Sequence, residues 1–367
     1  MGYTTGELSV DLRAIADNWK YIRDQLNASA ECGAVVKANA YGLGVERIAP
    51  KIYQAGCRNF FVANLKEAIQ LQSLVGRDSK IFVLTGCIAG AEGEFISRGL
   101  IPVIVSMEML KRWAAVSLGQ AHSGAALKVN TGMGRLGLEV SELSALAGDA
   151  QLLSEANIVY LMSHLACADI DPHVLNDIQI SRFSDVEKQL EGLGLEVKTT
   201  LANSAGVFLG RAAQCDLVRP GIALYGGNPG LKNNPMRSVV GLRLPVIQVR
   251  KLPSEESVGY GATKTFDTPH TIAVVAGGYA DGVMRSLSNR GWGWLGGQKV
   301  PIVGRVSMDS TLFDITGNPE ECSLREGDSI ELLGQNVSID DLAEAAGTIS
   351  YEILTSFGSR FQRCYME

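Results

Sequence analysis

A single lysine, Lys37, follows a short apolar run and precedes residues that favour a turn. The run is Ala34–Val36, of the kind found in β-strands, and Tyr41, Gly42 and Gly44 come after the lysine. Lysine is costly to bury, so a strand that delivers one inward indicates an amine that forms an imine or meets an anion. A solvated lysine at a strand end is the commoner alternative, and the rest of the chain has to decide between the two.

Further polar residues follow later apolar runs. Asn130–Arg135 follow one of them, His164 the next, Asn203 and Ser204 another, and Arg219–Ile222 surround the last. The Ser204 hydroxyl, with the backbone amides of Ser204 and Gly221, would form a phosphate cup at the strand ends. Taken singly, these residues also fit a buried histidine, a surface cation and a helix cap. Together, a lysine and a phosphate cup indicate pyridoxal phosphate, which needs an amine for its aldehyde and a cradle for its phosphate.

The glycine pattern at Gly132–Gly137 matches the spacing of a dinucleotide-binding loop. In such a loop the glycines open a helix whose N-terminus faces the pyrophosphate. Here Leu138–Val140 intervene before Ser141 could cap a helix, so dinucleotide binding is the weaker interpretation. A nicotinamide-dependent oxidoreductase stays as an alternative, and it would be indifferent to the loss of Lys37.

Apolar runs of strand type alternate with helical stretches through the first part of the chain. Eight strands alternating with helices over about 230 residues are typical of an α/β protein with a (β/α)₈ TIM-type barrel. The carboxyl ends of the strands form the active site of such a barrel, so the polar residues above would converge there. Asp11 is the expected N-cap of a helix that turns Leu12, Ile15, Trp19 and Ile22 to one face. The expected strands are Ala34–Val36, Asn59–Ala63, Ile81–Leu84, Pro102–Val105, Leu127–Asn130, Val159–Ser163, Lys198–Leu201 and Leu217–Val218 extended by Ile222–Tyr225, and the helices include Val45–Ala55, Lys66–Leu74, Met107–Val116, Ser141–Leu153, Pro172–Leu193 and Ser204–Leu209.

A loop rich in glycine, proline and asparagine, residues 226–235, marks a domain boundary. Short β-type runs dominate beyond it, with one helix expected at Ile339–Ala346 and Tyr351 after that helix. We therefore expect a barrel at residues 11–232, a mainly β domain at residues 233–367, and an N-terminal strand in residues 1–10 that packs with the β domain. Tyr260 and Tyr279 are flanked by glycines, which suits exposed phenols that act on a substrate.

The composition is that of an ordinary globular protein. The chain has 367 residues, 46% of them hydrophobic, a formal net charge of -6 and a pI of about 5.4. No positive field would attract nucleic acid or an anionic membrane, and there is neither a basic leader nor an apolar run of membrane-spanning length, so a cytoplasmic location is expected. The seven cysteines are scattered without paired metal-ligand spacing, so we expect reduced, mostly buried thiols and no metal site.

Taken in order, the motifs in both halves of the chain resemble those of the alanine racemases, pyridoxal-phosphate enzymes with a barrel followed by a β domain. The resemblance runs over essentially the whole chain. It implies an isomerase that interconverts L-alanine and D-alanine. The motifs that carry it are Ala34–Gly44 (AVVKANAYGLG), Lys128–Gly137 (KVNTGMGRLG), Ser163–Leu165, Ala202–Ser204, Arg219–Gly226 (RPGIALYG), Tyr260–Gly261, Gly278–Gly282 (GYADG) and Gly304–Asp309.

The resemblance implies that Lys37 holds the cofactor as a Schiff base and serves as acid and base on one face of the substrate α-carbon, with Tyr260 on the opposite face. Inverting a stereocentre requires a proton to leave one side and another to return on the other, so two groups must flank a planar carbanion. The cofactor supplies the electron sink. Arg219 resembles the arginine at the pyridine nitrogen, with His164 behind it. A guanidinium keeps its protons, which favours reprotonation at the α-carbon over transamination.

The resemblance also assigns the surrounding residues. Arg135 would lie near the phenolic oxygen of the cofactor and the substrate carboxylate, which the Met308 N–H would also meet. Lys128 corresponds to a lysine that is carbamylated in many members. In the family Tyr260 and Met308 reach the partner's cofactor, so a head-to-tail homodimer with composite sites is implied. The remaining cofactor-binding positions would be Tyr41, Asn203, Ser204, Gly221, Ile222 and Tyr351, and the substrate entrance would be lined by Asp169, Tyr279, Arg285, Arg305 and Tyr351.

Two further alternatives stay open. One is a racemase of the same architecture that prefers serine or a broader range of amino acids, and Ser307, where many members have cysteine, bears on this selectivity. The other is a non-catalytic pyridoxal-phosphate carrier, which would look like the barrel without the β domain, so the Tyr260 segment argues against it. D-Alanine could serve peptidoglycan synthesis, or the enzyme could belong to alanine catabolism.

Overall fold

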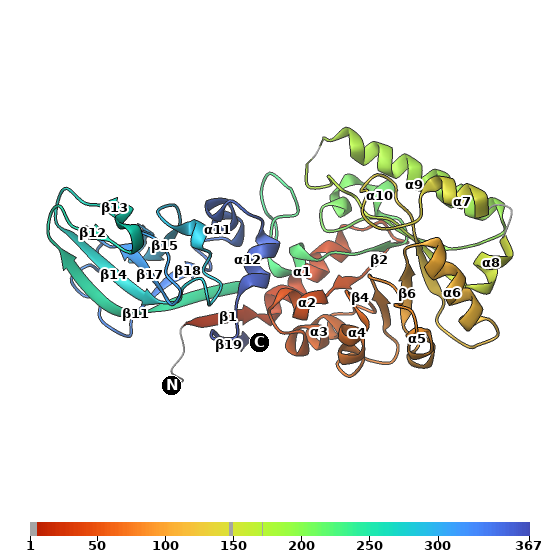
Figure 1. Cartoon of the computed structure of the whole chain (residues 1–367), viewed down its shortest axis with the longest axis horizontal. Helices are drawn as coiled ribbons and strands as arrows, with labels where there is room; N and C mark the ends of the chain where they lie inside the picture. Colours follow the sequence, from red (N-terminus) through yellow and green to blue (C-terminus); the bar gives the residue numbers. More distant parts are fainter. Residues whose placement is uncertain (1–5, 147–149, 171) are drawn as a thin grey trace.

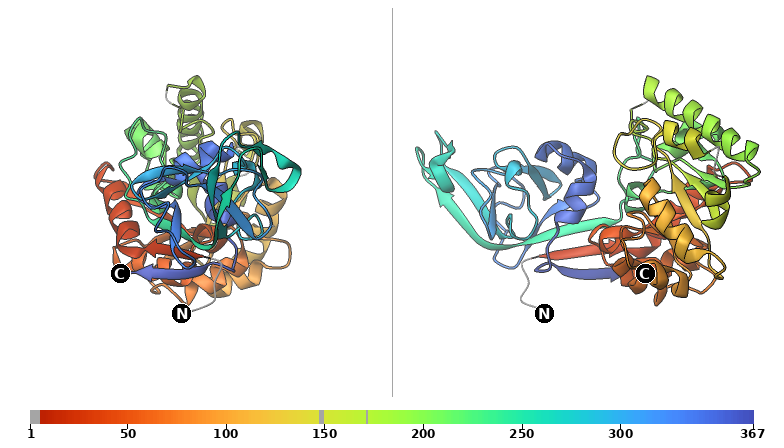
Figure 2. Two further views of the ribbon diagram at one scale, coloured as in Figure 1. Left: turned by 90° about the vertical axis from the view of Figure 1, so that its left-hand side faces the viewer. Right: turned by 45° about the vertical axis from the view of Figure 1, so that its right-hand side comes forward.

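The two halves of the chain form two lobes of an elongated molecule. In a computed structural model that describes residues 6–146, 150–170 and 172–367, the barrel lies at one end and a mainly β lobe at the other (Figure 1). Two turned views show the same separation (Figure 2). The predicted architecture, an α/β barrel of TIM type followed by a mainly β domain, is confirmed.

Seven parallel strands make the main sheet of the barrel. They pair in chain order, with registers such as Phe60 beside Ile81 and Leu127 beside Leu161. Their side chains are buried almost throughout, as expected for a parallel sheet covered by helices. The strands are β3 (Ala34–Val35), β4 (Asn59–Val62), β5 (Lys80–Val83), β6 (Ile101–Ile104), β7 (Ala125–Lys128), β8 (Ile158–Met162) and β9 (Lys198–Thr200).

The eighth strand completes the ring through the residues ahead of β3. β10 (Leu217–Val218) pairs in parallel with β2 (Glu31–Cys32). On its other side, the Asp216 amide donates to the Thr199 carbonyl at 3.1 Å, which joins β10 to β9. The expected barrel therefore has its eight strands, but the last one pairs with β2, a short strand that directly precedes β3.

Helices cover the outside of the barrel (Figure 1). Asp11 caps the first of them, because its side chain accepts a hydrogen bond from the Ala14 amide at 2.8 Å, and the predicted apolar face of that helix is buried. Asn64 and Ser106 cap two further helices in the same way. The helices are α1 (Leu12–Asp24), α3 (Val45–Gln54), α4 (Leu65–Gln72), α5 (Glu92–Arg98), α6 (Met107–Ser117), α7 (Val140–Leu146), α8 (Ala150–Glu155), α9 (Val174–Gly192) and α10 (Arg211–Gln214).

Three expectations about these segments are wrong. Ile222–Tyr225 form a 3₁₀ turn, η2, rather than a strand, because the Gly221 and Ala223 amides donate to the Ser204 hydroxyl instead of to a neighbouring strand. The helix expected from Ser204 begins only at Gly206, as a short 3₁₀ turn, η1 (Gly206–Leu209). The helix expected at residues 141–153 is divided between α7 and α8, and part of that stretch, 147–149, lies outside the described residues.

An eight-stranded sheet builds the second lobe. Its longest strand, β11 (Val240–Leu252), runs out from the barrel to the far end of the lobe (Figure 1). β1 (Glu7–Asp11) pairs antiparallel with β11 and parallel with β19 (Gln362–Met366), so the first and last described strands lie side by side. The short pair β12 (Ser257–Val258) and β13 (Lys264–Thr265) lies at the tip farthest from the barrel. The other strands are β14 (His270–Ala276), β15 (Trp292–Leu295), β16 (Gln298–Pro301), β17 (Ser310–Asp314) and β18 (Ser329–Leu333).

Two helices, α11 (Ile339–Ala346) and α12 (Ser350–Ser356), lie between the lobes (Figure 1). Asp340 accepts hydrogen bonds from the Asn228 amide at 3.0 Å and the Ser350 hydroxyl at 2.5 Å, which ties both helices to the loop at the domain boundary. Tyr351 follows the helix at Ile339–Ala346, as expected, and it is the second residue of a further helix, α12. The short Gly347–Ile349 link lets a second helix start at once.

All seven cysteines are free, and three of them, Cys32, Cys57 and Cys87, are buried. The expectation of mostly buried thiols is wrong for the others, because they lie in loops or on the terminal strand β19. Across the part of the chain that the structure describes, no helix is both long enough and apolar enough to span a membrane.

Candidate functional site

The carboxyl ends of the barrel strands surround a cavity of about 740 Å³. It collects side chains from nearly every strand end and from α12 in the second lobe. The predicted residues that line it are Lys37, Tyr41, Lys128, Arg135, His164, Asp169, Asn203, Ser204, Arg219, Gly221, Ile222 and Tyr351. The convergence expected from a barrel is therefore observed for these residues.

Lys37 opens a left-handed turn instead of ending a strand. β3 ends at Val35, and the turn α2 (Lys37–Tyr41) follows, with φ between 53° and 57° at Ala38, Asn39, Ala40 and Tyr41. Such a backbone costs L-residues roughly 1–2 kcal/mol each, so four in succession need support from outside the turn. Lys37 and Tyr41, at the two ends of the turn, both line the cavity.

Contacts from both lobes hold the far end of this turn. The Asn39 side chain accepts a hydrogen bond from the Val45 amide at 2.9 Å, where α3 starts. From β19, the Arg363 guanidinium donates to the Gly42 carbonyl at 2.9 Å and the Tyr365 hydroxyl donates to the carbonyl that follows it at 2.9 Å. Arg363 also donates to carbonyls at the end of α12, so it joins the turn that carries Lys37 to the helix that carries Tyr351.

Tyr41, Ser204 and Gly221 meet as an anion cup. The Ser204 hydroxyl accepts a hydrogen bond from the Gly221 amide at 2.9 Å, and the Tyr41 ring lies 4.6 Å from the Tyr225 ring and 5.8 Å from the Tyr351 ring. A Cβ on Gly221 would lie 2.3 Å from the Tyr41 hydroxyl, so glycine is required there. Burial raises the pKa of Tyr41 well above its ordinary value and that of Tyr351 to about 12, so both phenols keep a proton to donate. This cradle fits a phosphate group.

Arg219 is fixed elsewhere in the cavity wall. Its buried guanidinium donates to the Thr200 hydroxyl at 2.5 Å and to the carbonyls of Ser163 at 2.6 Å and Leu201 at 3.1 Å. Burial lowers the pKa of Arg219 to about 10, so the group stays charged at neutral pH. Nδ1 of His164 lies 3.2 Å from this guanidinium and must therefore accept a hydrogen bond from it. Burial, together with Arg219 and other cations, holds the pKa of His164 well below its usual value and keeps the imidazole neutral.

Two amines also border the cavity. Burial lowers the pKa of Lys37, and Arg135 lowers it further, whereas the carboxylate of Glu67 raises it. Burial lowers the pKa of Lys128 to about 8, and Arg219, Arg135 and Lys37 act in the same direction. Both shifts favour the neutral amine, which is the form that acts as a nucleophile or a base.

Apart from Tyr351, the predicted residues of the second lobe do not line this cavity. Tyr260 is 70% exposed and Met308 is 53% exposed, and Tyr260 follows β12 at the far tip of the molecule (Figure 1). The segments that carry them pack together, since the Tyr279 amide donates to the Ser307 carbonyl at 3.0 Å and a Cβ on Gly261 would lie 2.9 Å from the Arg305 guanidinium. The exposed residues of this group, called here the β-domain cluster, are Tyr260, Tyr279, Arg285, Arg305 and Met308.

The glycine loop after β7 is occupied by its own hydrogen bonds. The amides of Gly132 and Gly134 both donate to the Asn130 side chain, at 3.2 and 2.9 Å. The next helix, α7, begins only at Val140. A helix N-terminus facing a pyrophosphate is thus missing at this loop, which instead brings Arg135 to the cavity.

Several supporting residues were missed by the sequence analysis. The Thr131 and Ser163 hydroxyls lie 2.8 Å apart, and the amide of Gln179 on α9 donates to Thr131 and to the His164 carbonyl. Thr200 receives the shortest bond from Arg219. A hydroxyl at the end of an apolar strand gives some signal for Thr200 and Ser163, whereas nothing in the pattern of α9 singles out Gln179.

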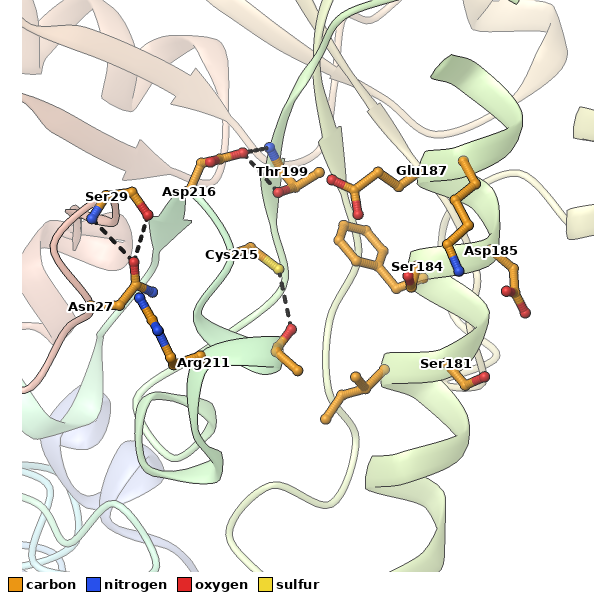
Figure 3. Close-up of a pocket in the computed structure, with 14 residues that line it drawn as sticks. Asn27, Ser29, Ser181, Ser184, Asp185, Glu187, Thr199, Arg211, Cys215 and Asp216 are labelled. Carbon is orange, nitrogen blue, oxygen red and sulfur yellow. Dashed lines mark hydrogen bonds between the residues drawn. The ribbon is translucent and has the colours of Figure 1, made fainter. Parts of the chain in front are cut away.

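A second hollow, of about 560 Å³, lies at the opposite, amino-terminal ends of β9 and β10 (Figure 3). Some of its polar groups bond to one another: Asp216 accepts from the amide and hydroxyl of Thr199, and Asn27 accepts from the Ser29 hydroxyl at 2.6 Å. Burial and nearby carboxylates raise the pKa of Glu187, which faces it from α9. This end of a barrel contributes to stability, so the candidate active site is the cavity at the carboxyl ends.

Comparison with known proteins agrees with this geometry. Family models of the alanine racemase N-terminal and C-terminal domains match residues 10–229 and 239–365. An alanine racemase of Rhodospirillum rubrum is 48% identical over 98% of this chain and 96% of its own, and a catabolic alanine racemase of Agrobacterium fabrum is 43% identical over 100% and 93%. The crystal structure of alanine racemase from Bartonella henselae with covalently bound pyridoxal phosphate has a TM-score of 0.93, 39% identity and 99% coverage of both chains. The chain therefore belongs to the alanine racemase family.

Proposed function

We propose that the chain interconverts L-alanine and D-alanine with two proton-transfer groups, Lys37 of one subunit and Tyr260 of a second copy. As a member of its family the chain is a pyridoxal-phosphate-dependent isomerase with alanine racemase activity. The observation that carries the proposal is the division of the site residues. The cavity holds the amine of Lys37 and two phenols that belong to the cup, Tyr41 and Tyr351, whereas Tyr260 is exposed and does not line this cavity.

The residues of the cavity fit the cofactor at both of its ends. Lys37 offers an amine whose pKa is lowered, and Arg219 offers a fixed guanidinium to the ring nitrogen. When bound, the cofactor supplies the electron sink that makes the α-proton of an amino acid acidic. The phosphate would be held by Tyr41, Ser204, Gly221, Ile222 and Tyr351, with Asn203 beside them.

Arg219 controls where a proton returns. Its guanidinium keeps its protons at neutral pH, and the neutral His164 behind it accepts a hydrogen bond rather than donating one. Because Arg219 donates without releasing a proton, negative charge stays close to the α-carbon. Lys37 on one face or Tyr260 on the other then returns the proton to that carbon, which gives racemisation rather than transamination.

A second copy of the chain supplies the missing half of the site. We place its Tyr260 opposite Lys37, and its Met308 amide beside Arg135 at the substrate carboxylate. The exposed position of both residues, away from the cavity of their own chain, supports this arrangement. The entrance would then be lined by Asp169 and Tyr351 of one subunit and by the remaining β-domain cluster of the other, and such an aromatic gate selects small side chains.

Mixing two inactive variants tests the composite site. Lys37→Ala and Tyr260→Phe should each abolish nearly all racemisation when alone. If they are unfolded and refolded together, half of the dimers are mixed, and each mixed dimer has one site with both groups intact, so about a quarter of the wild-type activity should return. Mixtures that stay inactive, with mixed dimers shown by native mass spectrometry, would refute the composite site. Substantial racemisation by Lys37→Ala alone would refute the role of Lys37.

Proton NMR in D₂O with L-alanine, L-serine and a larger amino acid, followed by a chiral assay, measures the substrate range. We expect alanine to exchange its α-proton for deuterium faster than the other two amino acids, and D-alanine to accumulate fastest among the products. Equal or faster exchange of serine would favour the broader racemase, and bound cofactor without exchange would favour the carrier. We assign the D-alanine to peptidoglycan synthesis or to alanine catabolism, and a requirement for added D-alanine after gene deletion would identify the biosynthetic role.

A further inference from the structure

A glutamate in the first turn of α4 reaches out of its own helix. Asn64 caps α4 by accepting a hydrogen bond from the Glu67 amide at 3.1 Å. In a capping box, the Glu67 carboxylate would bond back to the Asn64 amide. Instead, its Oε2 accepts from the Ala63 amide at 2.7 Å and its Oε1 accepts from the Ala38 amide at 2.9 Å. The second bond leaves the helix and reaches the segment that carries Lys37.

The two amides lie at the carboxyl ends of neighbouring strands. Ala63 follows β4, and Ala38 directly follows Lys37 after β3. The bonds within the left-handed turn begin at the Ala40 amide, which donates to Val36, so the Ala38 amide depends on an acceptor outside the turn. Residues of β19 bind the far end of the turn, and Glu67 binds its beginning. The turn is thus clamped on both sides of its positive-φ residues.

We propose that Glu67 is a positioning residue, which fixes the Lys37 side chain in the cavity by binding the amide that follows it. The proposal rests on the proposed role of Lys37 as the amine that binds the cofactor. A carboxylate at this place also adds a negative charge that acts on Lys37. The other titratable and charged groups of the cavity are Arg135 after β7, Lys128 on β7, the neutral His164 and Asp169 after β8, Arg219 beside β10, and the phenols Tyr41 and Tyr351.

Capture of the cofactor by the full-length chain measures this effect without turnover. Apoprotein is mixed with pyridoxal phosphate across a pH series and quenched with borohydride. The neutral amine of Lys37 condenses with the aldehyde, water leaves, and hydride reduces the C=N bond to a stable secondary amine. Peptide mass spectrometry then gives the labelling rate of Lys37. The labelling rate at high pH, where it reaches a plateau, reports how well the amine is positioned. The pH at half of this rate, the midpoint, reports the protonation of the amine.

Three variants separate position from charge and from helix capping. Glu67→Gln leaves one amide without an acceptor, so the plateau should fall about tenfold or more, and the loss of a negative charge should move the midpoint to lower pH. Glu67→Asp keeps the charge but is too short to reach both amides, so the plateau should fall while the midpoint stays. Asn64→Ala removes the cap of α4 and leaves the Glu67 bonds, so it should lower the melting temperature and keep the wild-type profile.

Two results would overturn the positioning role. One is a wild-type plateau in Glu67→Gln, and the other is an equal fall in Glu67→Gln and Asn64→Ala, which would make Glu67 a helix-capping residue only. A folded wild-type chain whose Lys37 is not labelled would instead refute the proposed function, and the role of Glu67 with it. The wild-type control therefore distinguishes the two failures.

Discussion

Lys128→Met is expected to stabilise the folded chain at neutral pH. Lys128 ends β7 and is 8% exposed, and the charged groups that act on its amine, Arg219, Arg135 and Lys37, are all cations. Removing the amine therefore removes two costs in free energy, the burial of its charge and its repulsion from these cations. Methionine is similarly long and flexible, so it can fill the same space.

The size of the effect follows from the pKa. A fall from 10.5 to about 8 corresponds to about 3 kcal/mol, which we reduce to about 2 kcal/mol because the amine borders a hydrated cavity. The unfolded chain keeps the ordinary pKa, so between pH 8 and pH 10.5 it holds more protons than the folded chain. The free energy of unfolding of the wild type must then rise with pH over that window. Below pH 8 the buried cation destabilises the folded chain by its full amount, and above pH 10.5 this destabilisation is gone.

Urea unfolding at neutral pH and at pH 10.5, in buffer free of carbon dioxide, measures the effect. The free energy of unfolding of Lys128→Met should exceed that of the wild type by about 2 kcal/mol at neutral pH and by about zero at pH 10.5. Burial raises the pKa of Cys57 to about 12, so this thiol also contributes to the pH dependence, but it does so equally in both proteins and cancels in the difference. A difference that stays constant with pH would show that the pKa of Lys128 is not lowered.

Bicarbonate provides a second arm of the same experiment. A neutral amine reacts with carbon dioxide, and the resulting carbamate would place an anion among Arg219, Arg135 and Lys37. We therefore expect bicarbonate to stabilise the wild type but not Lys128→Met, and ¹³C-bicarbonate to give a carbamate resonance only in the wild type. Equal responses of the two proteins would refute carbamylation at this site.

Two further substitutions probe the cup and the clamp around the turn. Gly221→Ala would place a methyl group 2.3 Å from the Tyr41 hydroxyl, so the chain should fold but lose pyridoxal phosphate on dialysis far faster than wild type; unchanged retention would contradict the cup. Arg363→Met removes the guanidinium that binds the Gly42 carbonyl and two carbonyls at the end of α12, so the free energy of unfolding should fall by about 2 kcal/mol, with Arg363→Lys in between; an unchanged urea midpoint would contradict the clamp.

Local patterns were sufficient for most of the fold. The alternation of apolar runs and helical stretches predicted the strands of the barrel, and Asp11 was recognised as a cap from its position before an amphipathic helix. These features depend on residues near each other in sequence, because the periodicity of apolar residues and the capping of a helix involve only neighbouring positions. The same logic failed at Ile222–Tyr225, where a distant hydroxyl, Ser204, competes for the backbone amides.

The groups of the site could be read from the sequence: an amine after a strand, a cup of small and hydroxyl residues, and an arginine. How these groups are held depends on the three-dimensional packing. Of the residues Ala38–Tyr41 only Asn39 is of a type that tolerates a left-handed backbone well, so the turn depends on contacts with Glu67 and Arg363, far away in the sequence. The tertiary structure also separated Tyr260 from the cavity of its own chain. Both outcomes depend on where whole elements pack against one another, which no local propensity encodes.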